Sequence, residues 1–205
     1  MRLDIEKVRL SSQDIKRIYF EAFPKNERMP FFLMVLMSKL WNTQFWGFYD
    51  RDIPCGFAYF AVNRKLLFLM FLAVDESLRR EGYGSAILKE IRNRYPEKKL
   101  IVSIEPCEDT SPDTEIRKRR KAFYGRNGYS ETDFQIKLSG VVQDVLIANG
   151  EFRKTSFYCF LSFTVTARFG QEYGGKMLLN SKCLDNDLKK HHLTKPSGGL
   201  CAVVS

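Results

Sequence analysis

The residues best placed for chemistry lie in a short turn that contains two glycines, Arg79-Arg80-Glu81-Gly82-Tyr83-Gly84. An unbroken apolar run, 66–74, precedes this turn and predicts a buried strand. An amphipathic segment that ends before Pro96 follows the turn and predicts a helix. The first amides of a helix have no partner within it and lie at its positive end, and glycine allows an anion to approach the main chain. The spacing therefore fits an anion-binding turn, but it also fits an ordinary connection between a strand and a helix.

A second motif lies further along the chain, where residues 120–129 read RKAFYGRNGY. Arg79-x-x-Gly82-x-Gly84 after a strand resembles the Arg/Gln-x-x-Gly-x-Gly/Ala motif of the GNAT superfamily of acetyltransferases. The later motif is similar to the second signature of that family, an aromatic-Tyr pair followed by glycine and another aromatic residue. The two motifs occur in the order of the family and at about its separation, with a predicted strand, 99–105, between them. The resemblance covers residues 1–165, whereas residues 166–205 form a C-terminal extension outside it.

The resemblance implies a fold and an activity. The fold is a single α/β domain with a mixed, mostly antiparallel central sheet flanked by helices, followed by a C-terminal tail. The activity is direct transfer of an acetyl group from acetyl-CoA to a primary amine within a ternary complex. The acceptor, a small molecule or a peptide, is left open. The alternative is a module of the same fold that senses acyl-CoA, or contacts RNA or ribosomes, without turnover.

The resemblance also implies a set of cofactor-binding residues. The backbone amides of the glycine turn bind the diphosphate of the coenzyme, and the end of the preceding strand pairs with its pantetheine arm. The implied residues are Leu72, Ala73, Val74, Arg79, Arg80, Glu81, Gly82, Tyr83, Gly84 and Ser85.

Two residues are candidates for proton transfer. Tyr124 is the expected acid that protonates the departing thiolate, since a tyrosine hydroxyl has a similar pKa and family members often place one here. Tyr124 could instead be a core aromatic residue. Glu105, at the end of a predicted strand, is the expected base, ahead of Glu27 in a polar loop, although Glu105 could also be an ordinary solvated carboxylate. The chain departs from the family at Arg117, where many members carry asparagine.

Composition excludes several other classes. The five cysteines of the 205-residue chain form no CxxC pair, and the adjacent His191 and His192 have no companion ligands, so we expect no metal site. No apolar stretch reaches membrane-spanning length, and the first ten residues do not resemble a secretory signal, so we expect a cytoplasmic protein without a membrane partner. The net charge of +9 and the cationic run 117–121 permit nucleic acid, but a solvated surface is the favoured interpretation.

The remaining pattern predicts the elements that must position these residues. Helices are expected over 15–23, 31–40 and from Ser111 to about 127, and strands over 1–8, 44–49, 56–62, 132–138 and 141–148. Residues 152–169 could form a helix or a strand. Beyond residue 169 the pattern specifies no element.

Overall fold

We describe a computed structural model of the chain, which covers residues 1–107, 113–138, 141–161 and 203–204. Its helices and strands follow in the order β1 (Asp4–Lys7), α1 (Gln13–Ala22), α2 (Phe31–Leu40), β2 (Thr43–Asp50), β3 (Ile53–Val62), β4 (Leu66–Val74), α3 (Tyr83–Arg94), β5 (Lys99–Ile104), α4 (Thr114–Arg126), β6 (Ser130–Leu138), β7 (Val141–Ala148), α5 (Lys154–Leu161) and β8 (Val203–Val204). Short 3₁₀ turns, η1 (Lys25–Glu27) and η2 (Glu76–Leu78), follow α1 and β4.

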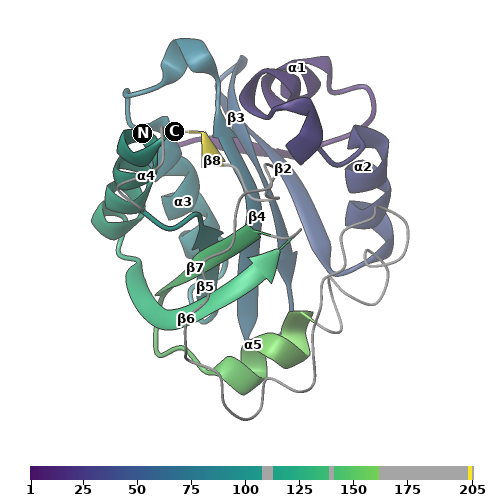
Figure 1. Cartoon of the computed structure of the whole chain (residues 1–205). Coiled ribbons are helices and arrows are strands. Elements are labelled where there is room, and N and C mark those ends of the chain that lie inside the picture. The colour runs from purple at the N-terminus through teal and green to yellow at the C-terminus, as the bar shows by residue number, and fades with distance from the viewer. Residues whose placement is uncertain (108–112, 139–140, 162–202, 205) are drawn as a thin grey trace.

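The strands form one mixed sheet in the order β1-β2-β3-β4-β5-β7-β6, with β8 added beside β4 (Figure 1). The pair β4–β5 is parallel, and the other pairs along this path are antiparallel. Both faces are covered. Helices α1, α2 and α5 contribute buried side chains to the core on one face, and α3 and α4 contribute theirs to the core on the other. The expected α/β fold, with a mostly antiparallel sheet flanked by helices, is confirmed.

Strand β4 lies at the centre of this arrangement, and all nine of its residues are buried. Such a strand cannot show the apolar-polar alternation of a half-exposed strand, because helices cover both of its faces. The pairing of β3 with β4 shifts at Met70: Tyr59 faces Phe71, whereas Phe60 faces Leu69. One extra residue in a strand is a β-bulge, which bends the strand and increases its twist. The bend therefore lies in the half of β4 that leads into the turn containing Gly82 and Gly84.

The parallel pairing of β4 with β5 ends at the same place. Leu66–Leu69 pair with Lys99–Val102, but the last residues of β4 have no partner in β5. The last residues of β5, Ser103 and Ile104, pair with β7 instead. The two central strands therefore separate after Leu69, and this separation leaves one backbone edge of β4 available to another segment.

The remaining sequence expectations can be compared with this structure. The segment 152–169, predicted as either a helix or a strand, contains helix α5, and Gly128, which follows the end of α4, has a φ of +79°. The expected helix start at Ser111 lies outside the described residues. The expectation for residues 166–205 also lies outside them, apart from the two residues of β8.

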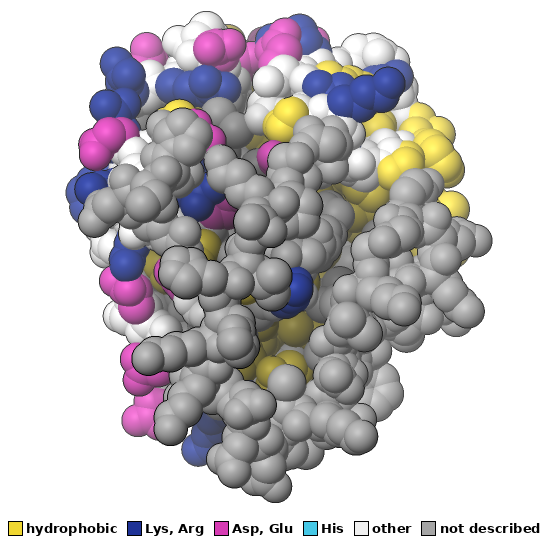
Figure 2. All heavy atoms as spheres, viewed as in Figure 1, with side chains coloured by type: hydrophobic (Ala, Val, Ile, Leu, Met, Phe, Trp, Pro, Cys, Tyr) yellow, Lys and Arg dark blue, Asp and Glu magenta, His cyan; other side chains and the backbone are white. Residues whose placement is uncertain are grey.

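The surface that Figure 2 displays is uneven. Basic and acidic side chains alternate along one margin, whereas hydrophobic side chains gather at the opposite margin, over α2. Phe32, Leu36 and Leu40 of α2 are among the exposed large hydrophobic residues. Over the described residues, no helix has the length and apolar character to cross a membrane, and no three potential metal ligands come together. Cys55, Cys107 and Cys159 carry free thiols.

Candidate active site

The glycine turn between β4 and α3 leaves amide groups available at the start of a helix. Arg80 and Gly82 have positive φ angles of +71° and +90°, and Gly82 is the residue that caps α3. Gly82 accepts a hydrogen bond from the amide of Ala86 (3.0 Å) through its carbonyl oxygen. The amides of Tyr83, Gly84 and Ser85 precede this bond in the first helical turn, where no internal acceptor exists. Together with the positive helix end, they provide donors suited to an anion.

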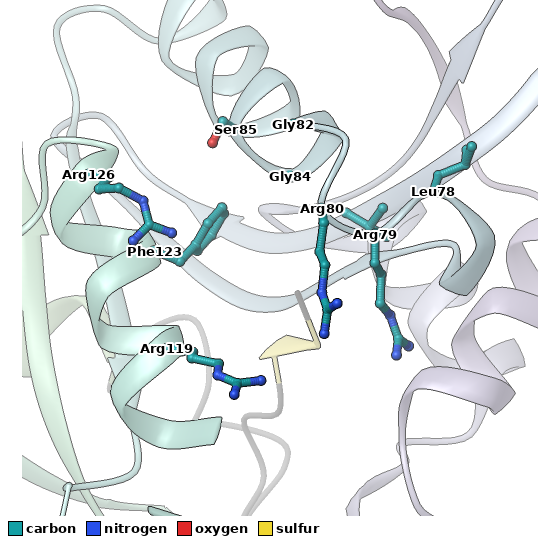
Figure 3. A pocket seen from close by; sticks show the side chains of 10 residues that line it. Leu78, Arg79, Arg80, Gly82, Gly84, Ser85, Arg119, Phe123 and Arg126 are labelled. Atoms are coloured by element: carbon teal, nitrogen blue, oxygen red, sulfur yellow. The ribbon is translucent and has the colours of Figure 1, made fainter. Parts of the chain in front are cut away.

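These amides lie beside a pocket of about 300 Å³ that is strongly cationic (Figure 3). The turn contributes Arg79 and Arg80 to its walls, and α4 contributes Arg119 and Arg126. Phe123 of α4 and Val74 of β4 supply apolar surface. The Nε atom of Arg79 is buried and has no hydrogen-bond partner among the described residues. A pocket with this lining is suited to a ligand that carries several negative charges.

Gly84 allows α3 and α4 to approach each other at this pocket. A Cβ atom built on Gly84 would lie 3.2 Å from the ring of Phe123 and 3.6 Å from a methyl group of Val74. The 3.2 Å contact with Phe123 is tighter than most van der Waals contacts of a Cβ atom, so a larger residue at position 84 would displace the ring of Phe123. The second glycine of the motif is thus explained by packing, whereas the first is explained by its backbone conformation.

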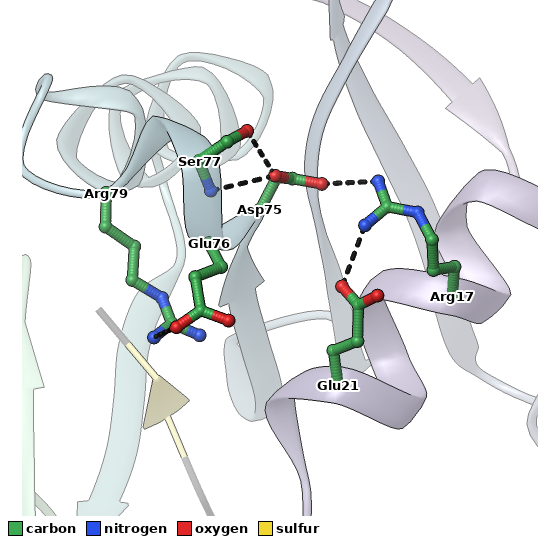
Figure 4. Close-up of polar contacts among 6 residues, drawn as sticks. All are labelled: Arg17, Glu21, Asp75, Glu76, Ser77 and Arg79. Atoms are coloured by element: carbon green, nitrogen blue, oxygen red, sulfur yellow. Dashed lines mark hydrogen bonds and ion pairs between the residues drawn. The ribbon is translucent and has the colours of Figure 1, made fainter.

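A cluster of polar contacts ties the turn to α1 (Figure 4). Asp75 accepts hydrogen bonds from the amide (3.0 Å) and the hydroxyl (2.6 Å) of Ser77 with one oxygen, and its other oxygen pairs with Arg17 (2.5 Å). Arg17 also pairs with Glu21 (2.7 Å). Burial acts to raise the pKa of Asp75, but the bonds from Ser77 and Arg17 outweigh it and hold that pKa below its usual value. The negative charge is therefore retained, and it stabilises the entry to the turn.

The free edge of β4 is occupied by the chain itself. Leu72 and Ala73 pair with Val203 and Val204 of β8 in parallel register. The resemblance implies that this edge pairs with the pantetheine arm of the coenzyme. In the structure β8 pairs with the same backbone edge.

The other residues predicted to bind the cofactor contribute in different ways. The side chains of Leu72 and Ala73 are buried in the core, so only their backbone groups can reach a ligand, whereas Val74 also lines the pocket. The side chain of Tyr83 is also buried, and its hydroxyl donates to Asp50 (3.0 Å). Glu81 is exposed and does not line the pocket.

Tyr124 lies deep in the domain, with no exposed surface. Its ring contacts those of Phe123 and Tyr129, at centroid distances of 5.2 Å in both cases. Phe123 lines the cationic pocket, and Tyr124 does not. These contacts fit both interpretations of Tyr124, because a core aromatic residue and an acid at the inner end of a coenzyme site would each be buried.

Glu105 is held by two arginines of α4. Its carboxylate lies 3.3 Å from Arg117 and 4.0 Å from Arg120, and the side chains of these arginines are only 19% and 11% exposed. Arg117 also donates to the carbonyl oxygen of Pro106 (3.2 Å). The expectation that the run 117–121 is a solvated surface is therefore wrong for these two positions. The helix directs them toward the end of β5, where a carboxylate compensates them.

Glu27, in the turn η1 between α1 and α2, has the electrostatic properties expected of a base. Burial raises the pKa of Glu27, the nearby carboxylate of Glu105 raises it further, and Arg120 opposes both effects. The charges of Glu105 and Arg120 therefore act on Glu27, although these residues are far from Glu27 in the sequence. A carboxylate whose pKa is shifted toward neutrality is better matched to proton abstraction than an ordinary one.

Comparison with known proteins agrees with this geometry. Residues 41–131 match the model of the acetyltransferase (GNAT) domain. The matched residues extend from just before β2 to the start of β6 and include both the glycine turn and α4. A comparison with curated proteins gave no significant match.

Solved structures show the same GNAT fold. A Bacteroides thetaiotaomicron protein assigned to the GNAT family aligns with a TM-score of 0.64 and 18% identity, over 78% of this chain and 95% of that one. A GNAT acetyltransferase of Elizabethkingia anophelis with bound acetyl-CoA aligns at 0.52 and 13% identity, over 73% and 99% of the two chains. A Bacillus subtilis acetyltransferase in complex with CoA aligns at 0.51 and 13% identity, over 73% and 100%.

Three features of this site were not predicted from the sequence. Arg119 and Arg126 are seven residues apart, a spacing that puts two residues on one helical face, and this was the available signal for their role in the pocket. The bulge at Met70 left no signal, because an apolar run reads the same with or without it. The approach of Glu27 to Glu105 depends on the packing of distant segments and could not be read locally.

Proposed function

We propose that this GNAT domain transfers the acetyl group of acetyl-CoA to the nitrogen of a primary amine. The observation that carries the proposal is the glycine turn after β4, where the amides of Tyr83–Ser85 have no acceptor within α3 and lie beside an arginine-lined pocket. These residues fit a diphosphate, since the main-chain donors, the helix end and Arg79 all favour negative charge. Acetyl-CoA supplies the activated acetyl thioester.

Different residues of the chain serve the separate steps of the reaction. The turn and Arg79 hold the diphosphate, and the edge of β4 beyond the bulge orients the arm through backbone hydrogen bonds. Glu27 accepts the proton of the acceptor ammonium group, because its pKa is raised. Glu105 is the less favoured base, because its carboxylate already pairs with Arg117 and Arg120. Tyr124 donates a proton to the departing thiolate. Binding of the arm requires β8 to leave the edge of β4.

A thiol-release assay with a panel of amines, paired with calorimetric binding of acetyl-CoA, tests this assignment. We expect Tyr124→Phe to slow release roughly 100-fold, the range of general acid catalysis, with little change in the dissociation constant of acetyl-CoA. Tyr129→Phe is the matched control, because Tyr129 is a buried neighbour in the same aromatic cluster. Equal turnover in the wild type and the Tyr124 variant would remove Tyr124 from the mechanism.

The two carboxylates can be separated in the same assay. Glu27→Gln should abolish the acid limb of the profile of kcat/KM against pH, a limb that the raised pKa of Glu27 shifts to higher pH. Glu105→Gln should leave that limb in place. If only the Glu105 variant lost the limb, the order of the two candidates would be reversed.

A second function is a coenzyme-binding module without turnover. The arginine at the position where many family members carry asparagine, Arg117, and the occupation of the β4 edge by β8 both favour this alternative. Binding of acetyl-CoA, without thiol release for any amine in the panel and without an effect of Tyr124→Phe, would support it.

A further inference from the structure

The cations of α4 fall into two groups. The helix, TEIRKRRKAFYGR, carries six of them, and four have a carboxylate within 4.0 Å. These are Arg117 and Arg120 with Glu105, Lys118 with Glu115, and Lys121 with Glu131. Arg119 and Arg126 have no carboxylate partner among the residues that the structure describes, and they are the two cations of α4 that line the pocket.

The two uncompensated arginines share one wall of the pocket. They lie two helical turns apart on the face of α4 that also presents Phe123. Figure 3 shows both side chains extending from α4, across the pocket from Arg79 and Arg80. Arg79 pairs with Glu76 (3.4 Å), whereas Arg80, Arg119 and Arg126 are exposed to solvent, so the space of about 300 Å³ keeps an excess of positive charge. This charge attracts a ligand that presents negative groups to both walls.

Coenzyme A has the matching chemistry. It carries a diphosphate and, on the ribose, a separate 3'-phosphate. The glycine turn, with its amides and Arg79, accounts for the diphosphate in the proposed function, which leaves Arg119 and Arg126 for a second, spatially distinct phosphate. Arginine suits this task because it forms charge-assisted hydrogen bonds with phosphate oxygens.

We propose that Arg119 and Arg126 form a subsite for the 3'-phosphate of coenzyme A, through which the domain selects coenzyme A over 3'-dephospho-coenzyme A. The inference rests on the proposed function, because it requires the diphosphate to lie at the glycine turn. It assigns part of the basic run on α4 to ligand selection instead of to nucleic acid.

Calorimetric titration of the full chain with coenzyme A and with 3'-dephospho-coenzyme A, at one fixed ionic strength, tests the subsite. We expect the wild type to bind coenzyme A at least about 10-fold more tightly, the effect of losing one charge-assisted contact. The double variant R119Q/R126Q should bind both ligands with nearly the affinity that the wild type has for the dephospho form. The preference should thus disappear while binding persists.

A matched control uses the same helix and the same change of charge. K118Q/K121Q also removes two cations from α4, but both are paired with carboxylates and neither lines the pocket. This variant should retain the wild-type preference, which separates a local contact from the general field of the helix. Thermal unfolding of both double variants would show that each remains folded.

The other outcomes refute the subsite in distinguishable ways. Equal affinity of the wild type for the two coenzymes would overturn the subsite and leave the proposed function intact. An equal loss for both ligands in R119Q/R126Q would show that these arginines serve the diphosphate or the general field. Failure of the wild type to bind either coenzyme would refute the proposed function and the subsite together.

Discussion

Gly82 offers a test that separates the ligand site from the stability of the fold. Its φ of +90° lies in the left-handed region, and a Cβ atom built there would have no atom within 4 Å apart from those of Gly82 and its two chain neighbours. Gly82→Ala therefore causes no clash in the free protein, and its cost is the strain of placing an L-residue at this φ, about 1 kcal/mol. For a chain of this size, that corresponds to a decrease in Tm of about 2–4 °C.

The effect of Gly82→Ala on binding should be much larger than its effect on stability. The added methyl group lies at a wall of the pocket, where an anion must approach the amides of the first turn of α3. Loss of one charge-assisted hydrogen bond is worth about 1.5–3 kcal/mol, which weakens binding about 10- to 150-fold. Calorimetric titration with acetyl-CoA measures this loss directly.

Gly128→Ala is the matched control for the same backbone strain. Gly128 has a φ of +79°, its added Cβ atom would lie 3.5 Å from the guanidinium of Arg92, and it does not line the pocket. We expect both variants to lose similar stability, and only Gly82→Ala to lose affinity. If the Gly82 variant bound acetyl-CoA as tightly as the wild type, or if both variants lost the same affinity, the turn would not be the site that binds the diphosphate.

Three further predictions concern the elements around the turn. Because the pKa of Asp75 is lowered in the folded protein, its stabilisation is present above the ordinary carboxyl pKa of about 3.9 and is lost as the pH falls through the folded value. Urea unfolding should therefore show that Asp75→Asn is less stable than the wild type by about 1–2 kcal/mol at pH 7 and by less at pH 3. An equal difference at pH 7 and pH 3 would refute the dependence of stability on the charge of Asp75. Gly56→Ala would place a Cβ atom 2.2 Å from the carbonyl oxygen of Ala73, and denaturant unfolding should show a loss of about 3 kcal/mol; a loss below about 0.5 kcal/mol would contradict this packing. Val203→Pro removes a backbone amide hydrogen from β8 and should weaken its pairing with β4. If β8 competes with the coenzyme for this edge, calorimetry should show about fivefold tighter binding of acetyl-CoA. Unchanged affinity would exclude the competition.

The glycine turn shows how far local sequence can carry a structural argument. The apolar run before the turn, the two glycines and the proline after the helix are local signals, and they predict a strand, a turn and a helix correctly. The positive φ of Gly82 and the close packing of Gly84 then account for the two glycines by different causes. Arg79 lines the pocket, but its predicted role in binding the coenzyme stays a prediction, and the pairing of Leu72 and Ala73 with β8 had no local signal.

The sequence by itself determined the order and type of most elements and the buried character of β4, because these depend on composition and periodicity over short windows. Only the tertiary structure decided which cations are compensated, where β4 separates from β5 and which glutamate has a raised pKa. Those properties depend on distances between residues that are remote along the chain. A run of arginines reads the same in the sequence whether a helix turns them toward a carboxylate, as with Arg117, or toward an open pocket, as with Arg119.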